Sequence, residues 1–141
     1  MENNKIAIID GELFINGKFK KGSIFIENNK IKRVVQKKVD RERLSGYYVI
    51  DAADCYVSYG FIDPHVHFRT PGQEYKEDWE SGSKAAIKGG YTFVIDMPNN
   101  SPPAIDEETL TSKNDRALKT KINYGFYIGL TDENAKNIKN I

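Results

Sequence analysis

The chain has 141 residues, and its 21 basic and 20 acidic side chains leave a formal net charge of +1. This balance excludes the strongly basic surface that nucleic acids and anionic membranes attract, so we expect neither partner. The single cysteine, Cys55, excludes an intrachain disulfide framework and is expected to be a buried structural thiol. The first residues show no long apolar segment and no small-residue cleavage site, which predicts a cytoplasmic protein without a membrane span.

The first 58 residues alternate short β-prone runs with turn signals. Asn16-Gly17 and Asn28-Asn29 supply residues that tolerate the positive φ of tight hairpins. This pattern predicts a small antiparallel β-module over residues 1–58, part of a β-sandwich. About fifty residues bury little core alone, so the module is expected to pack against another part of the protein. The predicted strands cover residues 5–9, 13–15, 23–26, 31–35 and 47–50.

From residue 59 the pattern changes to strands that alternate with helices. Near-continuous apolar strands in this order predict right-handed βαβ units and a parallel sheet. We therefore assign the α/β class, with residues 59–141 forming the first βα units, and the first three strands, of an incomplete (β/α)8 TIM-type barrel. A closed barrel of this type needs about 250 residues. The predicted strands are 61–68, 91–97 and 122–128, and the predicted helices are 77–88, a second from an Asp106 cap to about 120, and the beginning of a third within 132–141.

His65 and His67 are the only histidines of the chain, and one residue separates them within the predicted strand 61–68. Side chains at i and i+2 of a strand point to the same face, so two imidazoles at this spacing can bind one metal ion. Two hydrogen-bonded strand residues would show the same spacing, and the pair alone leaves that alternative open. The barrel context favours the metal site, because active sites of such barrels gather at the C-terminal ends of the strands.

A series of motifs extends from residue 60 to residue 103. It comprises GFIDPHVHFR (60–69), TPG (70–72), EYKE (74–77), GSKAA (82–86), GGYT (89–92) and DMPNNSPP (96–103). In this order the motifs resemble the dihydroorotases of the amidohydrolase superfamily. The β-module before them resembles the N-terminal part of the same group more loosely, and the resemblance is weaker after residue 103.

The resemblance implies a zinc centre, usually binuclear, that reversibly cyclises N-carbamoyl-L-aspartate to dihydroorotate in pyrimidine biosynthesis. Zinc activates water for attack on the ring amide carbonyl and polarises that carbonyl. The resemblance assigns His65 and His67 as metal ligands, and Arg69 and Asn99 as substrate-binding residues for the carboxylate. Arg69 also stands one strand step beyond His67, which predicts the same face, and Asp63 is expected to orient an imidazole or tie down the strand. The implied partners are the small-molecule substrate and either a second copy of the chain or an aspartate carbamoyltransferase.

The family's remaining groups are expected beyond residue 141: a bridging carboxylate or carboxylated lysine, two further histidines and a proton-shuttle aspartate. No catalytic residue is therefore assigned here, and the chain alone is expected to be inactive. Allantoinase and dihydropyrimidinase share the two-histidine strand, but Arg69 and Asn99 favour a substrate that carries a carboxylate. A non-catalytic pseudo-dihydroorotase subunit is the alternative from another class, and the retention of all four site residues argues against it.

Overall fold

Two sheets divide the chain near the residue at which the sequence pattern changes. The computed structural model describes residues 5–136 and 138. Its two compact units are Met1–Tyr59 and Gly60–Ile141, a boundary one residue later than the expected one. Each unit has its own cluster of buried apolar side chains, so each is a separate packing unit.

Two tight turns build the first sheet. Strands β1 (Lys5–Ile15), β2 (Lys18–Glu27) and β3 (Lys30–Val35) form consecutive antiparallel pairs. The connecting residues Asn16-Gly17 and Asn28-Asn29 all have positive φ, between 50° and 76°, as the sequence predicted for the hairpins. A small cluster of Ala7, Ile9, Phe25 and Leu44 forms the centre of the core of this unit, and Leu13 and Ala52 are also buried.

The first sheet is mixed, so the prediction of a wholly antiparallel module is wrong for its last two strands. Strands β4 (Tyr48–Asp51) and β5 (Tyr56–Val57) both pair parallel with β1, after a 3-10 helix at Arg41–Leu44. The predicted strands 5–9 and 13–15 are one strand, β1. Its pairing with β2 continues across an irregularity between Ile8 and Gly11, where Asp10 has φ 62°. The expectation of a buried thiol is also wrong, since Cys55 is exposed.

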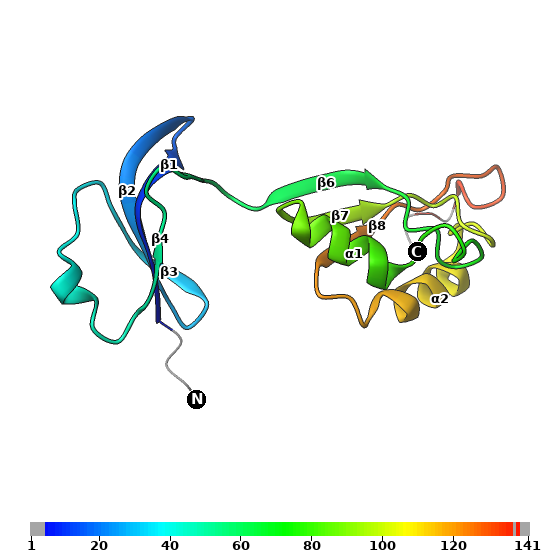
Figure 1. The fold of residues 1–141 in the computed structure, drawn as a ribbon. Helices are drawn as coiled ribbons and strands as arrows, with labels where there is room; N and C mark the ends of the chain where they lie inside the picture. The colour runs from blue at the N-terminus through cyan, green and yellow to red at the C-terminus, as the bar shows by residue number, and fades with distance from the viewer. Residues whose placement is uncertain (1–4, 137, 139–141) are drawn as a thin grey trace. The chain divides into compact units, whose positions relative to one another are not determined.

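The second unit has the predicted α/β arrangement, which confirms the fold class. Strands β6 (Phe61–Val66), β7 (Tyr91–Asp96) and β8 (Asn123–Phe126) form a parallel sheet in the order β6-β7-β8. Helices α1 (Trp79–Lys88) and α2 (Glu107–Ala117) connect them, and α1 runs along β7 (Figure 1). The core beneath them contains Phe68, Trp79, Val94, Ala117 and Ile122.

Both helices of the second unit begin at an aspartate. The Asp78 carboxylate accepts a hydrogen bond from Ser81 N–H at 2.7 Å, and the Asp106 carboxylate accepts one from Thr109 N–H at 2.8 Å. Each forms a capping box, which confirms the predicted Asp106 cap.

Residues 132–136 form turns, so the helix expected to begin at 132 is not present there, while residues 137 and 139–141 of that prediction lie outside the described residues. Within 5–136 and 138, no helix has both the length and the apolar character that a membrane crossing demands.

Candidate metal and substrate site

The two histidines lie where β6 ends. Strand β6 is irregular between Asp63 and Val66, and the Asp63 carboxylate accepts a hydrogen bond from His65 N–H at 3.1 Å. Asp63 therefore ties down the backbone and does not orient an imidazole. His67 lies one residue past the strand, yet its Nε2 is 3.2 Å from His65 Nε2. The predicted convergence of the two rings is present, although only His65 belongs to the strand.

Asn99, in the loop after β7, contacts the second imidazole. Its Oδ1 lies 2.9 Å from His67 Nδ1, and an amide oxygen can only accept, so the ring donates Nδ1–H. A neutral His67 then carries its lone pair on Nε2, the atom that faces His65. Metal-binding histidines commonly donate the N–H of their other ring nitrogen in this way, which fixes the tautomer and the orientation of the ring.

The donor set fits two positions of a zinc ion. Two nitrogen ligands at Zn–N distances of about 2.0–2.1 Å in tetrahedral geometry are roughly 3.3 Å apart, close to the 3.2 Å between the Nε2 atoms. Coordination through both atoms requires His65 to hold its proton on Nδ1. Among the described residues no group of three or more histidine, cysteine or acidic side chains is placed to hold a metal ion, so this part of the chain offers two ligands.

Arg69 occupies a strained position just beyond the histidines. Its φ is 62°, a left-handed backbone conformation that costs a residue with a Cβ roughly 1–2 kcal/mol. Because β6 ends at Val66, the strand alternation that predicted Arg69 on the face of His67 does not extend to it. Its carbonyl accepts a hydrogen bond from Gln73 N–H at 2.9 Å, which closes the turn. Its substrate-binding role stays a prediction.

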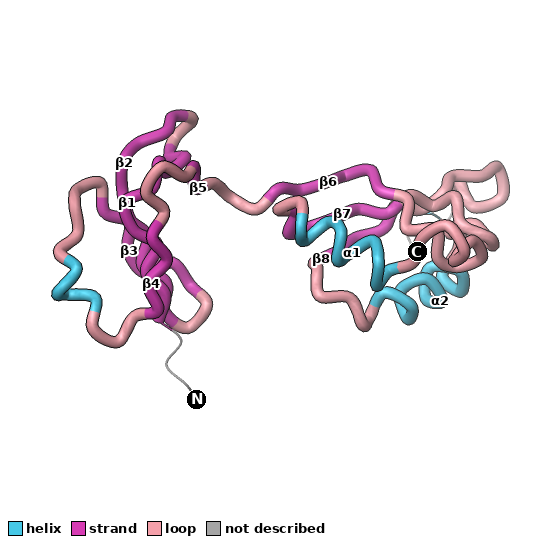
Figure 2. Tube along the Cα trace, in the orientation of Figure 1, coloured by secondary structure: helices cyan, strands magenta, loops and turns pink. Residues whose placement is uncertain are grey.

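The loops that follow β6 and β7 leave the same end of the sheet (Figure 2), and backbone hydrogen bonds join this region. Met97 N–H donates to Val66 O at 2.9 Å, and Ser101 N–H donates to Pro71 O at 3.1 Å. The contact is close at Gly72, where a Cβ would lie 2.1 Å from Ser101 O. His67, Arg69 and Asn99 therefore lie on two loops that share a backbone interface.

A buried ion pair lies beneath these loops, and sequence reasoning missed it. The side chains of Lys113 and Asp96 are both 0% exposed, with Nζ 2.9 Å from Oδ2. Lys113 Nζ also donates to Asn100 Oδ1 at 2.7 Å and to Met97 O at 2.6 Å. The available signals were a lysine three residues after Leu110 and four before Ala117, on the apolar face of a helix, and an aspartate ending an apolar strand.

Burial lowers the pKa of the Lys113 ammonium below its ordinary value, because desolvation disfavours the charged form. The neighbouring Asp96 carboxylate acts in the opposite direction. Burying such a pair costs desolvation free energy, which is recovered only where the geometry is good and further hydrogen bonds are made.

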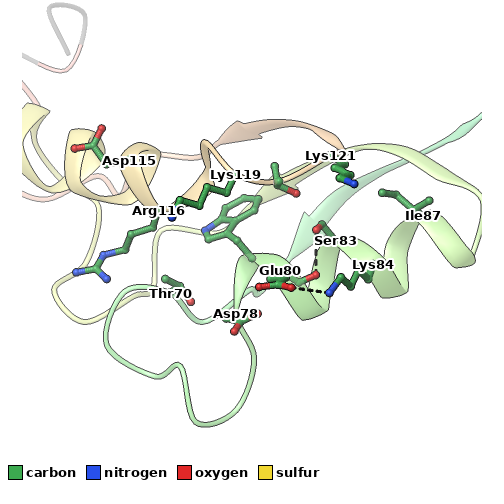
Figure 3. Close-up of a pocket in the computed structure, with 12 residues that line it drawn as sticks. Thr70, Asp78, Glu80, Ser83, Lys84, Ile87, Asp115, Arg116, Lys119 and Lys121 are labelled. Carbon is green, nitrogen blue, oxygen red and sulfur yellow. Dashed lines mark hydrogen bonds and ion pairs between the residues drawn. The ribbon is translucent and has the colours of Figure 1, made fainter.

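A separate cavity of about 650 Å³ lies beside α1 and the end of α2 (Figure 3). Lys84 and Arg116 line it, but each has an acidic partner, Glu80 at 2.6 Å and Glu74 at 3.7 Å. None of the four candidate residues lines this cavity, which places it outside the candidate site.

Comparison with known proteins indicates the same family as the motifs do. The model of the amidohydrolase family matches residues 56–140. The dihydroorotase of Sulfurihydrogenibium sp. is 49% identical over 100 residues, which cover 71% of this chain and 22% of that protein. The dihydroorotase of Aquifex aeolicus is 44% identical over 105 residues, covering 74% of this chain and 23% of that protein. The chain thus spans less than a quarter of the length of these relatives.

Solved structures match both units. L-hydantoinase (dihydropyrimidinase) from Arthrobacter aurescens gives a TM-score of 0.82 at 22% identity, covering 98% of this chain and 30% of that one, which shows the fold. D-hydantoinase (dihydropyrimidinase) from Thermus sp. gives 0.74 at 31% identity, covering 96% of this chain and 30% of that one. The β-module and the parallel βα units therefore occur together in larger proteins of this fold.

Proposed function

Because the chain belongs to the amidohydrolase family, we propose that it supplies the first two metal ligands and the carboxylate-binding residues of a dihydroorotase. The observation that carries this proposal is the convergence of His65 Nε2 and His67 Nε2, 3.2 Å apart, with His67 held by Asn99. The identities of 44–49% to proteins named dihydroorotase support the choice of substrate. The proposed reaction is the reversible cyclisation of N-carbamoyl-L-aspartate to dihydroorotate.

The proposal divides the site into a metal-binding side and a substrate-binding side. His65 and His67 would hold zinc through Nε2, and the bound metal would supply an activated water and polarise the amide carbonyl. Arg69 binds the substrate carboxylate with two parallel N–H donors. Asn99 accepts from His67 through Oδ1, which leaves both Nδ2 hydrogens to donate to the same carboxylate. Asn99 thus joins the metal side of the site to the substrate side.

The second candidate function is a dihydropyrimidinase. It is favoured by the solved structures named hydantoinase, which match the fold over nearly the whole chain. Dihydrouracil lacks the carboxylate of dihydroorotate, so Arg69 distinguishes the two candidates. A site for dihydrouracil would leave the guanidinium without a partner in the substrate.

The test joins this chain to the remainder of the Aquifex aeolicus dihydroorotase, in place of the matching segment of that protein. We expect ring opening of dihydroorotate by the joined protein and none by the 141-residue chain alone. Arg69→Ala is expected to raise KM for dihydroorotate roughly 30-fold or more, because it leaves a carboxylate without its charged partner. The measurement is steady-state kinetics on dihydroorotate and on dihydrouracil.

The matched control is Arg116→Ala, which removes a guanidinium from the second helix, outside the candidate site. This variant is expected to leave kcat and KM for dihydroorotate unchanged. Preferential hydrolysis of dihydrouracil, with no effect of Arg69→Ala on dihydroorotate, would replace the proposal by the dihydropyrimidinase. Turnover that survives His65→Ala would overturn the metal-binding assignment.

A further inference from the structure

The buried ammonium of Lys113 has a hydrogen-bonding environment that a simple core position does not need. Three oxygen atoms lie within 2.9 Å of Nζ: two of them accept hydrogen bonds from it, and the third makes an ion pair only. They belong to Asp96 at the end of β7, and to Met97 and Asn100 in the loop that follows. All three contacts therefore lie at the end of the sheet where the candidate site is.

Two of these partners connect Lys113 to the loop that follows β6. The Asp96 carboxylate accepts from Phe68 N–H at 2.8 Å, between His67 and Arg69 in the sequence. The Asn100 amide donates through Nδ2 to Thr70 O at 3.0 Å, next to Arg69, while its Oδ1 accepts from Lys113. Asn100 is also the neighbour of Asn99. The network thus reaches a residue adjacent to His67, to Arg69 and to Asn99.

The energetics argue against stability as the purpose of the pair. A buried ion pair is often no better for stability than apolar side chains of similar volume, and it costs a good deal when only one partner remains. What a charged network supplies is fixed distances and angles between its members. Here the network fixes the positions of the two loops that carry three of the four candidate site residues.

We propose that Lys113 is a positioning residue, which acts through Asp96 and Asn100 to hold His67, Arg69 and Asn99 in their metal-binding and substrate-binding arrangement. This inference rests on the proposed function, because it gives those three residues their roles. Without the ammonium, Asn100 Oδ1 and Met97 O lose their donor. The loop after β7 is then free to shift, and Asn99 no longer holds His67 in the Nδ1–H form.

The first experiment uses the metal-free 141-residue chain and reads the His67 imidazole by nitrogen-15 NMR. In the wild type we expect the chemical shifts of a fixed Nδ1–H tautomer. Asp96→Asn combined with Lys113→Met removes both charges at once, so no unpaired charge is buried, and the amide oxygen introduced at position 96 can still accept from Phe68 N–H. We expect this double variant, and Asn100→Ala, to show averaged tautomers at His67.

The second readout is the affinity of the same chains for Co²⁺, measured by titration calorimetry and by the visible absorption of the bound ion. Loss of a group that orients a ligand typically weakens metal binding about 10- to 100-fold, and we expect a loss of about 10-fold in both variants. Asn114→Ala is the matched control, since Asn114 lies next to Lys113 on α2 and accepts from Tyr124 O–H at 3.2 Å. It should leave tautomer and Co²⁺ affinity unchanged.

The outcomes separate the two proposals. A fixed His67 tautomer and unchanged Co²⁺ affinity in both variants, with the fold retained, would overturn the positioning role and leave the metal site standing. The variants could instead change the His67 tautomer as expected, while His65→Ala leaves the Co²⁺ affinity of the chain unchanged. That result would retain the positioning effect and overturn the metal-binding part of the proposed function.

Discussion

The two units of the chain differ in one respect: only the second buries an ion pair among the described residues. In the first unit, the Arg41–Asp51 pair is short, at 2.5 Å, but both side chains are well exposed, and the buried residues are almost all apolar. In the second unit, Lys113 and Asp96 are fully buried and hydrogen-bonded to two loops. The buried pair thus contacts the two loops that carry candidate site residues, whereas the Arg41–Asp51 pair is exposed to solvent.

The largest expected effect on stability is a difference between the buried and the exposed ion pair. Lys113→Met leaves the Asp96 carboxylate buried and unpaired, and should lower the free energy of unfolding of the second unit by about 3–5 kcal/mol. Arg41→Met removes an exposed partner, and its effect should be too small to resolve. Urea unfolding checks this, followed for the second unit by the fluorescence of Trp79, the only tryptophan, and for the first by circular dichroism. Equal losses in the two units would contradict the comparison.

The next effect compares two glycines with positive φ. Gly72 has φ 95° and a Cβ there would lie 2.1 Å from Ser101 O, whereas Gly17 has φ 76° and faces open space. Gly17→Ala should therefore cost only the backbone strain, roughly 1–2 kcal/mol. Gly72→Ala should cost a further 1–3 kcal/mol or so from overpacking between the loops. Thermal unfolding of both variants measures the difference, and a smaller loss at Gly72 would count against a tight loop interface.

A smaller effect concerns strain at the site itself. Arg69 and Asn29 both have positive φ, 62° and 60°, but asparagine tolerates this region better than arginine does. Arg69→Gly should therefore stabilise the chain by about 0.5–1 kcal/mol after the entropy of glycine is subtracted, whereas Asn29→Gly should change little. Arg69→Ala provides the control, since it removes the guanidinium and keeps the strain. A loss of stability in Arg69→Gly would show that the side chain, not the backbone, dominates at this position.

The smallest expected effect is a loss of stability at acid pH, which should occur in both units. The pKa of Asp78 is lowered by hydrogen bonds from the Ser81 backbone and side chain, and that of Asp51 by hydrogen bonds from Ala53 N–H and from Arg41. A lowered carboxylate pKa contributes stability above the ordinary value of 3.8, and this contribution is lost as pH falls through the lower folded value. Acid titration of the unfolding transition should show this loss in both units. Asp78→Asn should reduce it in the second unit only, and Asp51→Asn in the first only.

Much of the fold was predictable because local patterns determine it. Asn-Gly and Asn-Asn turns placed the hairpins, and apolar runs with an aspartate cap placed the strands and helices of the second unit. The parallel pairing of β4 and β5 with β1 was not predictable, because strands of four and two residues carry no orientation signal of their own. Pairing partners far apart in sequence are chosen by packing.

The sequence nominated the residues of the candidate site but did not predict their geometry. The spacing of His65 and His67 predicted convergence, but His67 reaches its position from a loop, after an irregularity in β6 that no motif indicates. The left-handed backbone of Arg69 and the contact of Asn99 with His67 depend on how two distant loops meet. The role of Lys113 was not predictable, because a charge on the apolar face of a helix is explained only by its partner, Asp96, which lies 17 residues away in the sequence.

The ion pair also has a consequence for how such a chain can change over generations. Replacing either Lys113 or Asp96 alone leaves a buried charge uncompensated, while replacing both together does not. The two positions, 17 residues apart in the sequence, should therefore be inherited as one unit: a lineage keeps both charges or loses both. A single substitution at either position is therefore not neutral. Losing the pair one residue at a time requires an intermediate protein that folds poorly.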